Sequence, residues 1–186
     1  MLYLASSSPR RREVLKSLGV NFRVRRPDYH ERNHRHEVPS KIVQRHALGK
    51  ATSVAKKLSF GTVLGADTLV FHHKKIIGKP RNLKEARKIL SALQGRWHVV
   101  YTGVALLDVS SGVTKRKRVF FEKTSVRLKK MSQEEILSYF KKINPLDKAG
   151  AYAIQDRRGS IVEEIKGSFS NAVGLPVEKL YGKLKP

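Results

Sequence analysis

The sequence predicts an α/β protein with a mixed sheet and several hairpins. Short apolar runs typical of buried strands recur along the whole chain of 186 residues. Between these runs lie segments in which apolar residues recur every three or four positions, as on one face of a helix. The two kinds of segment do not alternate regularly, and short turns join several strands directly. We therefore expect hairpins rather than a uniform βαβ sheet.

Length and composition indicate one domain over residues 1–186, formed of two lobes. A domain usually holds about 100–200 residues, and 40% of this chain is hydrophobic, which suffices for a core. The chain has no cysteine, which excludes disulfides, thiolate metal sites and cysteine nucleophiles. No apolar run approaches the ~18 residues that span a bilayer, and the apolar start is too short for a signal peptide. We expect a soluble, cytoplasmic protein without membrane contact.

The chain is strongly basic, with 39 Lys and Arg against 15 Asp and Glu and a net charge of +24. Such a surface attracts polyanions. Two classes of protein therefore stay open, a nucleic-acid binder and an enzyme that acts on small phosphorylated substrates. The basic clusters are spread along the chain without interleaved aromatic residues for base stacking, so most of them are expected to form a solvated surface.

The first elements follow from local turn chemistry. Residues 2–5 form an apolar strand, and the hydroxyls of residues 6–8 with Pro9 favour the start of a helix. That helix is expected to end at Gly19. A second strand over residues 20–24 follows, and then a polar loop to residue 38.

A long helix is expected from Pro39 to about Leu58, since small and apolar residues recur on one of its faces. Residues 62–66 form a buried strand with Asp67 and Thr68 at its end. Residues 69–71 come after that end and lead to a turn.

The second half of the chain alternates helices with hairpin strands. A helix with an apolar face ends at Gly95, and Ser132 with Glu135 forms a capping box that opens another helix. Pro176 begins the last helix. Residues 110–112 are a hairpin turn. The remaining expected strands are residues 98–109, 114–121, 123–128 and 161–165.

A turn between the first strand and the first helix could bind phosphate. The hydroxyls of Ser6 and Ser8, free backbone N–H groups and the guanidinium groups of Arg10 and Arg11 meet there at the positive end of a helix dipole. The alternative is an ordinary helix cap followed by solvated arginines. No P-loop, dinucleotide-binding glycine pattern or nucleophile elbow is present in the sequence.

Single charged residues are less informative. Asp67 could hold Mg²⁺ or deprotonate a water molecule, or it could bond to turn backbone. Lys50 lies at the edge of an apolar helical face, and Lys79 stands in a Gly-Lys-Pro turn, where each could be a surface lysine. A polar loop carries side chains that could form a metal cluster, although a loop gives weak geometry: His30, Glu31, His34, His36 and Glu37.

Six tracts together resemble the Maf family of nucleotide pyrophosphatases from end to end. In order, they are residues 4–11, 65–70, 77–80, 101–106, 147–155 and 167–176. The resemblance implies an elongated, two-lobed molecule with a deep central cleft, related in fold to inosine-triphosphate pyrophosphatases. It also implies a house-cleaning hydrolase that converts a nucleoside triphosphate to the monophosphate and pyrophosphate with Mg²⁺ or Mn²⁺. Family members often look dimeric, so a homodimer is an expected state.

The resemblance also assigns roles to residues. Asp67 would be the general base that activates water for attack on the α-phosphorus, and Glu31 would help it hold the metal. Lys50 and Lys79 would neutralise the triphosphate. The residues expected around the same phosphates are Ser6, Ser8 and Arg11.

Three positions track base preference in the family. Arg10, Thr68 and Gln155 match the branch that acts on dTTP and UTP, whereas the sister branch prefers 7-methyl-GTP. An amide such as that of Gln155 can pair with an imide edge as both donor and acceptor. The resemblance therefore implies a pyrimidine substrate, including modified pyrimidine triphosphates.

The chain departs from the family at three places. His30 precedes Glu31 where the family usually has an acidic pair, Asn144 replaces an acid, and Asp156 replaces a glycine. None of these changes removes Asp67 or Lys50, so we expect an active enzyme. The alternative is a basic nucleic-acid-associated protein on a Maf-like fold with weak or no catalysis.

Overall fold

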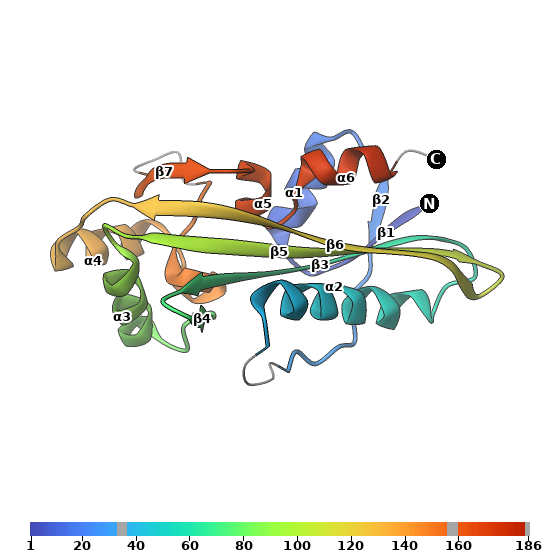
Figure 1. The fold of residues 1–186 in the computed structure, drawn as a ribbon, viewed down its shortest axis with the longest axis horizontal. Coiled ribbons are helices and arrows are strands. Elements are labelled where there is room, and N and C mark those ends of the chain that lie inside the picture. Colours follow the sequence, from blue (N-terminus) through green and yellow to red (C-terminus); the bar gives the residue numbers. More distant parts are fainter. Residues whose placement is uncertain (33–36, 156–159, 185–186) are drawn as a thin grey trace.

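Three long antiparallel strands form the spine of the molecule in the computed structural model, which describes residues 1–32, 37–155 and 160–184 (Figure 1). They are β3 (Gly61–His72), β5 (Trp97–Ser110) and β6 (Val113–Leu128). The shorter strands are β1 (Leu2–Ala5), β2 (Phe22–Val24), β4 (Lys75–Ile77) and β7 (Val162–Lys166). The order is β2-β1-β3-β5-β6-β7, with β4 beside β3. β1 runs parallel to both its neighbours and the other pairs are antiparallel, which confirms the predicted mixed sheet.

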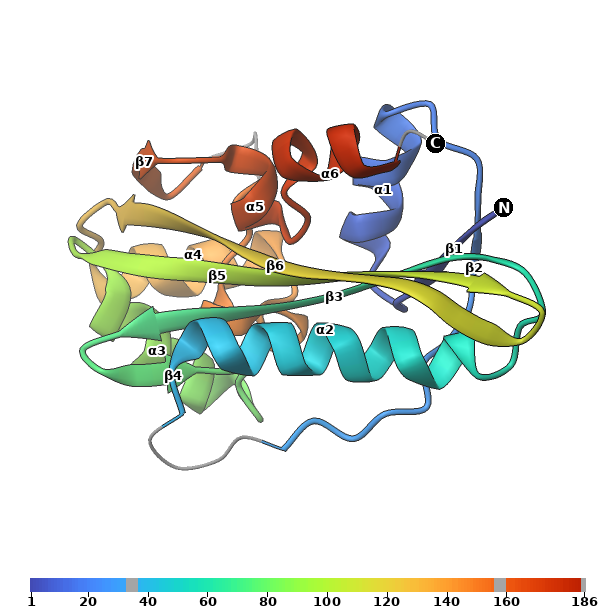
Figure 2. The ribbon, with the colours of Figure 1, turned by 45° about the vertical axis from the view of Figure 1, so that its right-hand side comes forward.

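Helices cover the sheet on both faces. The helices are α1 (Pro9–Ser17), α2 (Pro39–Ala55), α3 (Leu83–Leu93), α4 (Gln133–Lys142), α5 (Phe169–Val173) and α6 (Val177–Leu184), with short turns η1 (Pro145–Asp147) and η2 (Ala149–Ala151). α2 packs on one face through Ala47, Ala51 and Val54. α1 and α6 lie on the opposite face (Figure 2), where Leu15 and Leu180 belong to a buried cluster. No helix in the described ranges is both long and apolar enough to cross a bilayer.

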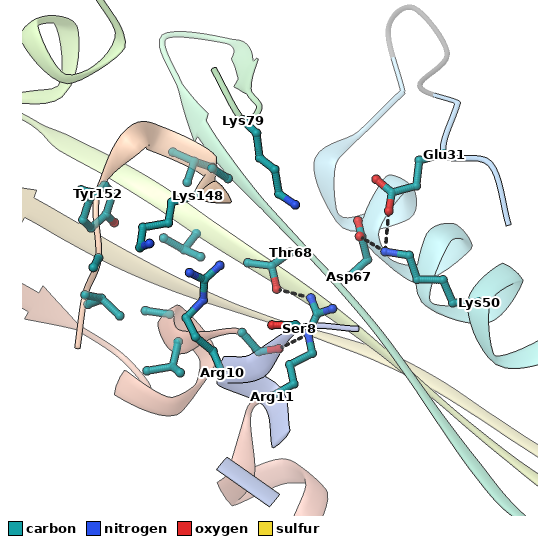
Figure 3. A pocket seen from close by; sticks show the side chains of 18 residues that line it. Ser8, Arg10, Arg11, Glu31, Lys50, Asp67, Thr68, Lys79, Lys148 and Tyr152 are labelled. Atoms are coloured by element: carbon teal, nitrogen blue, oxygen red, sulfur yellow. Dashed lines mark hydrogen bonds and ion pairs between the residues drawn. The ribbon is translucent and has the colours of Figure 1, made fainter. Parts of the chain in front are cut away.

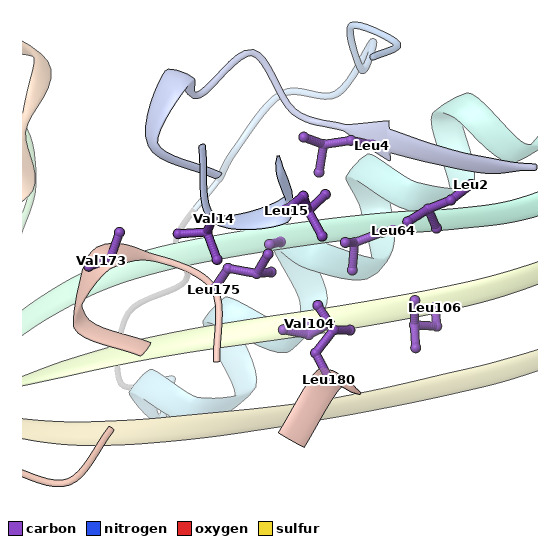
Figure 4. Close-up of a cluster of buried hydrophobic side chains, with 11 residues drawn as sticks. Leu2, Leu4, Val14, Leu15, Leu64, Val104, Leu106, Val173, Leu175 and Leu180 are labelled. Carbon is purple, nitrogen blue, oxygen red and sulfur yellow. The ribbon is translucent and has the colours of Figure 1, made fainter. Parts of the chain in front are cut away.

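The long strands join two separate cores, which confirms the expected elongated, two-lobed shape. Near the N-terminal end of β3, one face of β3 and β5 carries a cluster to which Leu4, Leu15 and Leu180 belong (Figure 4). Toward the other end, Leu90 and Ile136 from α3 and α4 belong to a second cluster on the same strands.

The edge of β3 is open between the two lobes. β1 pairs with residues 62–65 of β3, and β4 pairs with residues 70–72. Residues 66–69 therefore have no strand beside them on this edge within the described chain. Asp67 and Thr68 lie in this gap.

Two glycines bring α2 directly onto the sheet. A Cβ atom on Gly65 would lie 2.2 Å from the carbonyl oxygen of Ala47, and one on Gly103 would lie 2.3 Å from the backbone of Val43. Such distances are shorter than van der Waals contact, so a side chain at either position would push the helix away.

Several local predictions are confirmed, and others are wrong. The capping box at Ser132 forms, and the first helix starts at Pro9 as expected. Asp67 is not at a strand end, because Leu69–Phe71 continue the strand and pair with β5. Ser8 precedes α1 but its hydroxyl makes no capping bond. The two strands expected over residues 114–128 are one continuous strand, because β5 pairs with it from Val113 to Arg127.

The close approach of α2 predicts the effect of a single methyl group. We expect Gly103→Ala to lower the free energy of unfolding by about 1–3 kcal/mol through overpacking, measured by urea denaturation. Gly182→Ala is the matched control, since a Cβ there would meet no atom within 4 Å. A Gly103→Ala protein that unfolds at the same urea concentration as the original would contradict this packing. The single domain over residues 1–186 stays a prediction, which one cooperative transition would support.

Candidate active site

Two adjoining hollows lie over the gap in the β3 edge and form one cleft. Figure 3 shows the first of them. The first is also lined by apolar residues from β3, β5, η2 and α5. The second extends over the start of α1 and the loop after β2. The residues that line both are Ser8, Arg10, Arg11, Glu31, Lys50 and Lys79.

Lys50 joins two carboxylates at the centre of the cleft. Its Nζ lies 2.6 Å from Oδ1 of Asp67 and 2.6 Å from Oε1 of Glu31. Lys50 and Asp67 are buried, whereas the side chain of Glu31 is 53% exposed. An ion pair this short between buried groups holds the carboxylate of Asp67 in one orientation. The helical lysine therefore fixes a strand carboxylate that faces the cleft.

Glu31 reaches this centre because its loop is anchored on α2. The ring of Tyr29 lies against Gly49, where a Cβ would come within 2.1 Å of it. The hydroxyl of Tyr29 is 2.9 Å from Nδ1 of His46. Partial burial is the largest influence on the pKa of Glu31 and raises it, but Lys50, helped by His46 and Arg11, outweighs burial. The pKa of Glu31 is therefore lower than usual, so it stays a carboxylate.

Arg11 is fixed in the cleft by uncharged partners. Its Nε donates to the carbonyl of Gly174 at 2.9 Å, Nη1 to Oγ of Ser6 at 3.2 Å, and Nη2 to Oγ1 of Thr68 at 2.9 Å. Burial lowers the pKa of Arg11 and the charge of Asp67 opposes this shift. A guanidinium stays protonated in proteins, so Arg11 is a rigid positive charge available to an anion.

Further cations line the same cleft. Figure 3 shows Arg10 reaching between Lys148 and Thr68, with Lys79 pointing in from the opposite side. The backbone N–H of Ser8 donates to Oγ of Ser6 at 3.2 Å, and Ser8 opens α1 with no side-chain cap. The positive end of α1 therefore adds to the attraction for anions.

The end of the cleft away from Glu31 is apolar. Its small side chains come from Ala149, Ala153 and Ala172, and Tyr152 closes it. The hydroxyl of Tyr152 lies 2.7 Å from Nε2 of His98, and both residues are buried. Such a surface suits the flat, partly apolar rings of an organic ligand.

The structure brings most of the predicted site residues together. Ser6, Ser8, Arg10, Arg11, Glu31, Lys50, Asp67, Thr68 and Lys79 all line the cleft. Gln155 is exposed, and it follows Ile154, which lines the cleft. Asn144 accepts from the backbone N–H of Leu146 and caps η1.

The histidine-rich metal cluster finds no support in the described residues. Among these, no group of three or more His, Asp or Glu side chains is placed to hold a metal ion. His34, His36 and Asp156 lie outside the described residues. The carboxylates that do converge are those of Glu31 and Asp67.

Several lining residues were not among the predicted site residues, and Lys148 and Tyr152 are two of them. Nζ of Lys148 lies 2.5 Å from Oδ1 of Asp147 and 2.9 Å from the carbonyl oxygen of Asn144. Both missed residues stand in the tract of residues 147–155, whose mixture of small and polar residues was the available signal. The partner of Tyr152 is 54 positions away in the chain, so no local pattern could reveal it.

Comparison with known proteins gives one consistent result. A family model described as Maf-like protein matches residues 1–186. A dTTP/UTP pyrophosphatase from Gloeobacter violaceus is 44% identical over 96% of this chain and 92% of its own length. Proteins of the same description from Thermosipho melanesiensis and Bacillus anthracis are 41% and 42% identical. They cover 97% and 99% of this chain and 94% of their own lengths.

Two solved structures resemble the fold more distantly. The Staphylococcus aureus Ham1 protein is 15% identical with a TM-score of 0.49, covering 98% of this chain and 97% of its own. A nucleoside-triphosphatase / dITP/XTP pyrophosphatase from Mycobacterium abscessus is also 15% identical, with a TM-score of 0.41 and coverage of 70% and 74%. At these scores neither likeness bears on the activity.

The buried His98 predicts a pH dependence of stability. Burial, with a smaller effect of His72, lowers the pKa of His98 to about 4 from 6.5. The unfolded chain therefore binds a proton between these values while the folded protein does not. The free energy of unfolding is therefore highest, as far as His98 is concerned, above pH 6.5. It falls as the pH drops toward 4, by roughly 3 kcal/mol in total.

The test compares unfolding of the original protein with that of His98→Gln, which carries no titrating ring. As the pH falls from 6.5 to 4, the unfolding free energy of the original protein should decrease more than that of His98→Gln. Parallel stability curves across that range would show that His98 is not held neutral by the fold.

Proposed function

The chain belongs to the Maf family, and on that premise we propose that it hydrolyses dTTP and UTP to the monophosphate and pyrophosphate. The observation that carries this proposal is the buried pair of Lys50 and Asp67, 2.6 Å apart, in a cleft lined with cations. Relatives described as dTTP/UTP pyrophosphatases align with nearly the whole chain. Modified pyrimidine triphosphates belong to the same substrate class.

The cleft suggests how a triphosphate lies. The apolar end beside Tyr152 would take the base and sugar, and the hollow over the start of α1 would take the outer phosphates. The α-phosphorus would then lie near Asp67 in the shared part. Phosphoryl transfer depends mainly on positioning and on stabilising charge, and the fixed cation of Arg11 suits both tasks.

Asp67 is the proposed general base. Lys50 contacts Oδ1, so the proton from the attacking water passes to Oδ2. The water oxygen bonds to the α-phosphorus while the bond from that phosphorus to its bridging oxygen breaks. Pyrophosphate leaves with its charge spread toward Lys79 and the arginines of α1, and the monophosphate keeps the new oxygen.

A divalent cation fits the same centre. Glu31 and Asp67 both approach Lys50 Nζ, so their carboxylates are close enough to share a cation. Mg²⁺ is usually held by one or two carboxylates together with substrate phosphates and water. We propose Mg²⁺ or Mn²⁺ held by Glu31 and Asp67, which would neutralise phosphate charge. His30 in place of a further carboxylate would lower the metal affinity.

Base selection is proposed for Arg10, Thr68 and Gln155. Arg10 and Thr68 line the cleft, and Gln155 stands beside the cleft residue Ile154, which supports a role near the base. Because Asp67, Lys50, Lys79 and Arg11 share one cleft, an active enzyme is favoured over a catalytically weak nucleic-acid platform. A homodimer and a cytoplasmic location stay predictions.

The test is pyrophosphate release from dTTP, UTP, CTP, GTP, 7-methyl-GTP and ITP, each with Mg²⁺, Mn²⁺ or EDTA. Metal-dependent cleavage led by dTTP and UTP is the expected result. Cleavage led by a purine triphosphate would keep the reaction and overturn the assignment of base preference. No cleavage of any triphosphate would overturn the proposed function.

Asp67→Asn tests the general base. Asparagine keeps the shape and a contact for Lys50 but cannot take the proton, so we expect kcat to fall at least ~10²-fold. Asp108→Asn is the matched control, since Asp108 pairs with Arg118 and lies outside the residues that line the cleft. Near-normal kcat in Asp67→Asn, with the control also normal, would refute the assignment.

Gln155→Glu tests base readout separately from triphosphate binding. A carboxylate cannot donate to the base edge, so kcat/KM for dTTP should fall relative to GTP. Inhibition by pyrophosphate, which has no base, should change little. An unchanged ratio between dTTP and GTP would assign base selection to other residues.

A further inference from the structure

One face of the sheet is left uncovered beyond the first turn of α2. In β5, His98, Val100 and Thr102 are buried on one side, whereas Trp97, Val99 and Tyr101 on the other side are only half-buried. Figure 2 shows the ends of β3, β5 and β6 extending past α2. On that side Ile42 and Val43 at the start of α2 pack against Phe71, Tyr101 and Phe121. Trp97 and Val99 lie further along β5 and belong to none of the buried clusters of the described chain.

The half-buried residues at and beyond the start of α2 are mainly aromatic. We call this surface the aromatic face, defined by Phe71 of β3, Trp97 and Tyr101 of β5, and Phe121 of β6. The ring centroids of Phe71 and Tyr101 are 6.2 Å apart at 90°, and those of Tyr101 and Phe121 are 6.3 Å apart. Tyr101 and Phe121 lie toward α2, whereas Phe71 and Trp97 border open space and offer flat surfaces for stacking.

A hollow of about 360 Å³ opens on this face. It is lined by Phe71, Trp97, Val99, Ser125 and Lys166, among others, and none of these lines the catalytic cleft. The hollow is open to solvent and is as large as a small-ligand site. It therefore has room for one flat ring laid against an aromatic side chain.

Cations surround the aromatic face. Nζ of Lys166 lies 4.6 Å from the ring centroid of Trp97 and 3.4 Å from Glu164. Lys123 is exposed opposite Tyr101, and Lys74 and Lys75 are exposed at the nearby β3–β4 turn. The whole chain has a net charge of +24. These lysines therefore favour an anionic partner at the aromatic face.

We propose that the aromatic face binds single-stranded nucleic acid, with bases stacked on Trp97 and Phe71 and phosphates near Lys166. Duplex bases stack on each other and are not available to a flat protein surface, so the single-stranded form is the one that fits. Base–aromatic stacking contributes about 1–3 kcal/mol per base, whatever the base. The face is separate from the triphosphate cleft, so this binding does not depend on the proposed hydrolysis.

Trp97 is the single tryptophan of the chain, so its fluorescence reports directly on this face. The experiment titrates the full chain with 12-nucleotide oligo(U), oligo(dT) and a 12-base-pair duplex. Saturable quenching by both single strands, stronger than by the duplex and weakened by salt, is the expected result. Unequal affinity for oligo(U) and oligo(dT) would distinguish RNA from DNA as the partner.

Matched variants separate stacking from general charge. Phe71→Ala and Lys166→Gln should each weaken binding at least about fivefold, measured by anisotropy of a labelled oligonucleotide. The controls are Phe60→Ala and Lys117→Gln, which remove an exposed ring and an exposed charge elsewhere. These should change affinity less than twofold. Hydrolysis of dTTP should be unchanged in all four, and thermal unfolding checks that each variant folds.

Three results would overturn the proposal. The first is a Trp97 signal that no single strand changes. The second is equal loss of binding in Lys166→Gln and Lys117→Gln, which would mean that charge alone attracts the oligonucleotide. The third is quenching of Trp97 fluorescence when the protein concentration rises without oligonucleotide, together with dimers observed in sedimentation. That result would assign the face to a second copy of this chain.

Discussion

The contact of α2 with bare backbone on β3 and β5 is the constraint from which the site follows. Gly65 and Gly103 let the helix lie so close that Lys50 meets Asp67 at 2.6 Å. The gap between β1 and β4 leaves this part of β3 open on its edge. The same helix holds Tyr29 against Gly49 and so brings Glu31 to Lys50. Packing therefore assembles residues from three segments into one charged centre.

The charges of the cleft are unequal in a way that suits a polyanion. Two carboxylates meet one ammonium and Asp147 pairs with Lys148, while Arg10, Arg11 and Lys79 bring further positive charge. The hydrogen bonds that Arg11 donates go to a carbonyl and two hydroxyls. Its positive charge is therefore not neutralised by a hydrogen-bonded carboxylate. Such preorganised cations need little rearrangement when charge develops on a leaving pyrophosphate.

Local chemistry predicted part of the molecule from the sequence. The capping box at Ser132 and the hairpin turn at Ser111 form as expected, because neighbouring residues suffice to define them. The gap that exposes Asp67 depends on where two distant strands stop pairing, so the sequence suggested a strand end instead. Helix α5 has 5 residues and shows no periodicity to detect. The aromatic face was missed because its rings come from separate strands, far apart in the chain.

The most direct test of the account is the position of attack by water. The protein is incubated with dTTP and Mg²⁺ in water enriched in ¹⁸O, and the masses of the products are measured by mass spectrometry. Attack at the α-phosphorus beside Asp67 predicts dTMP that carries the label and pyrophosphate that does not. Labelled pyrophosphate, or release of dTDP and inorganic phosphate, would place the attack elsewhere and contradict the orientation of substrate in this cleft.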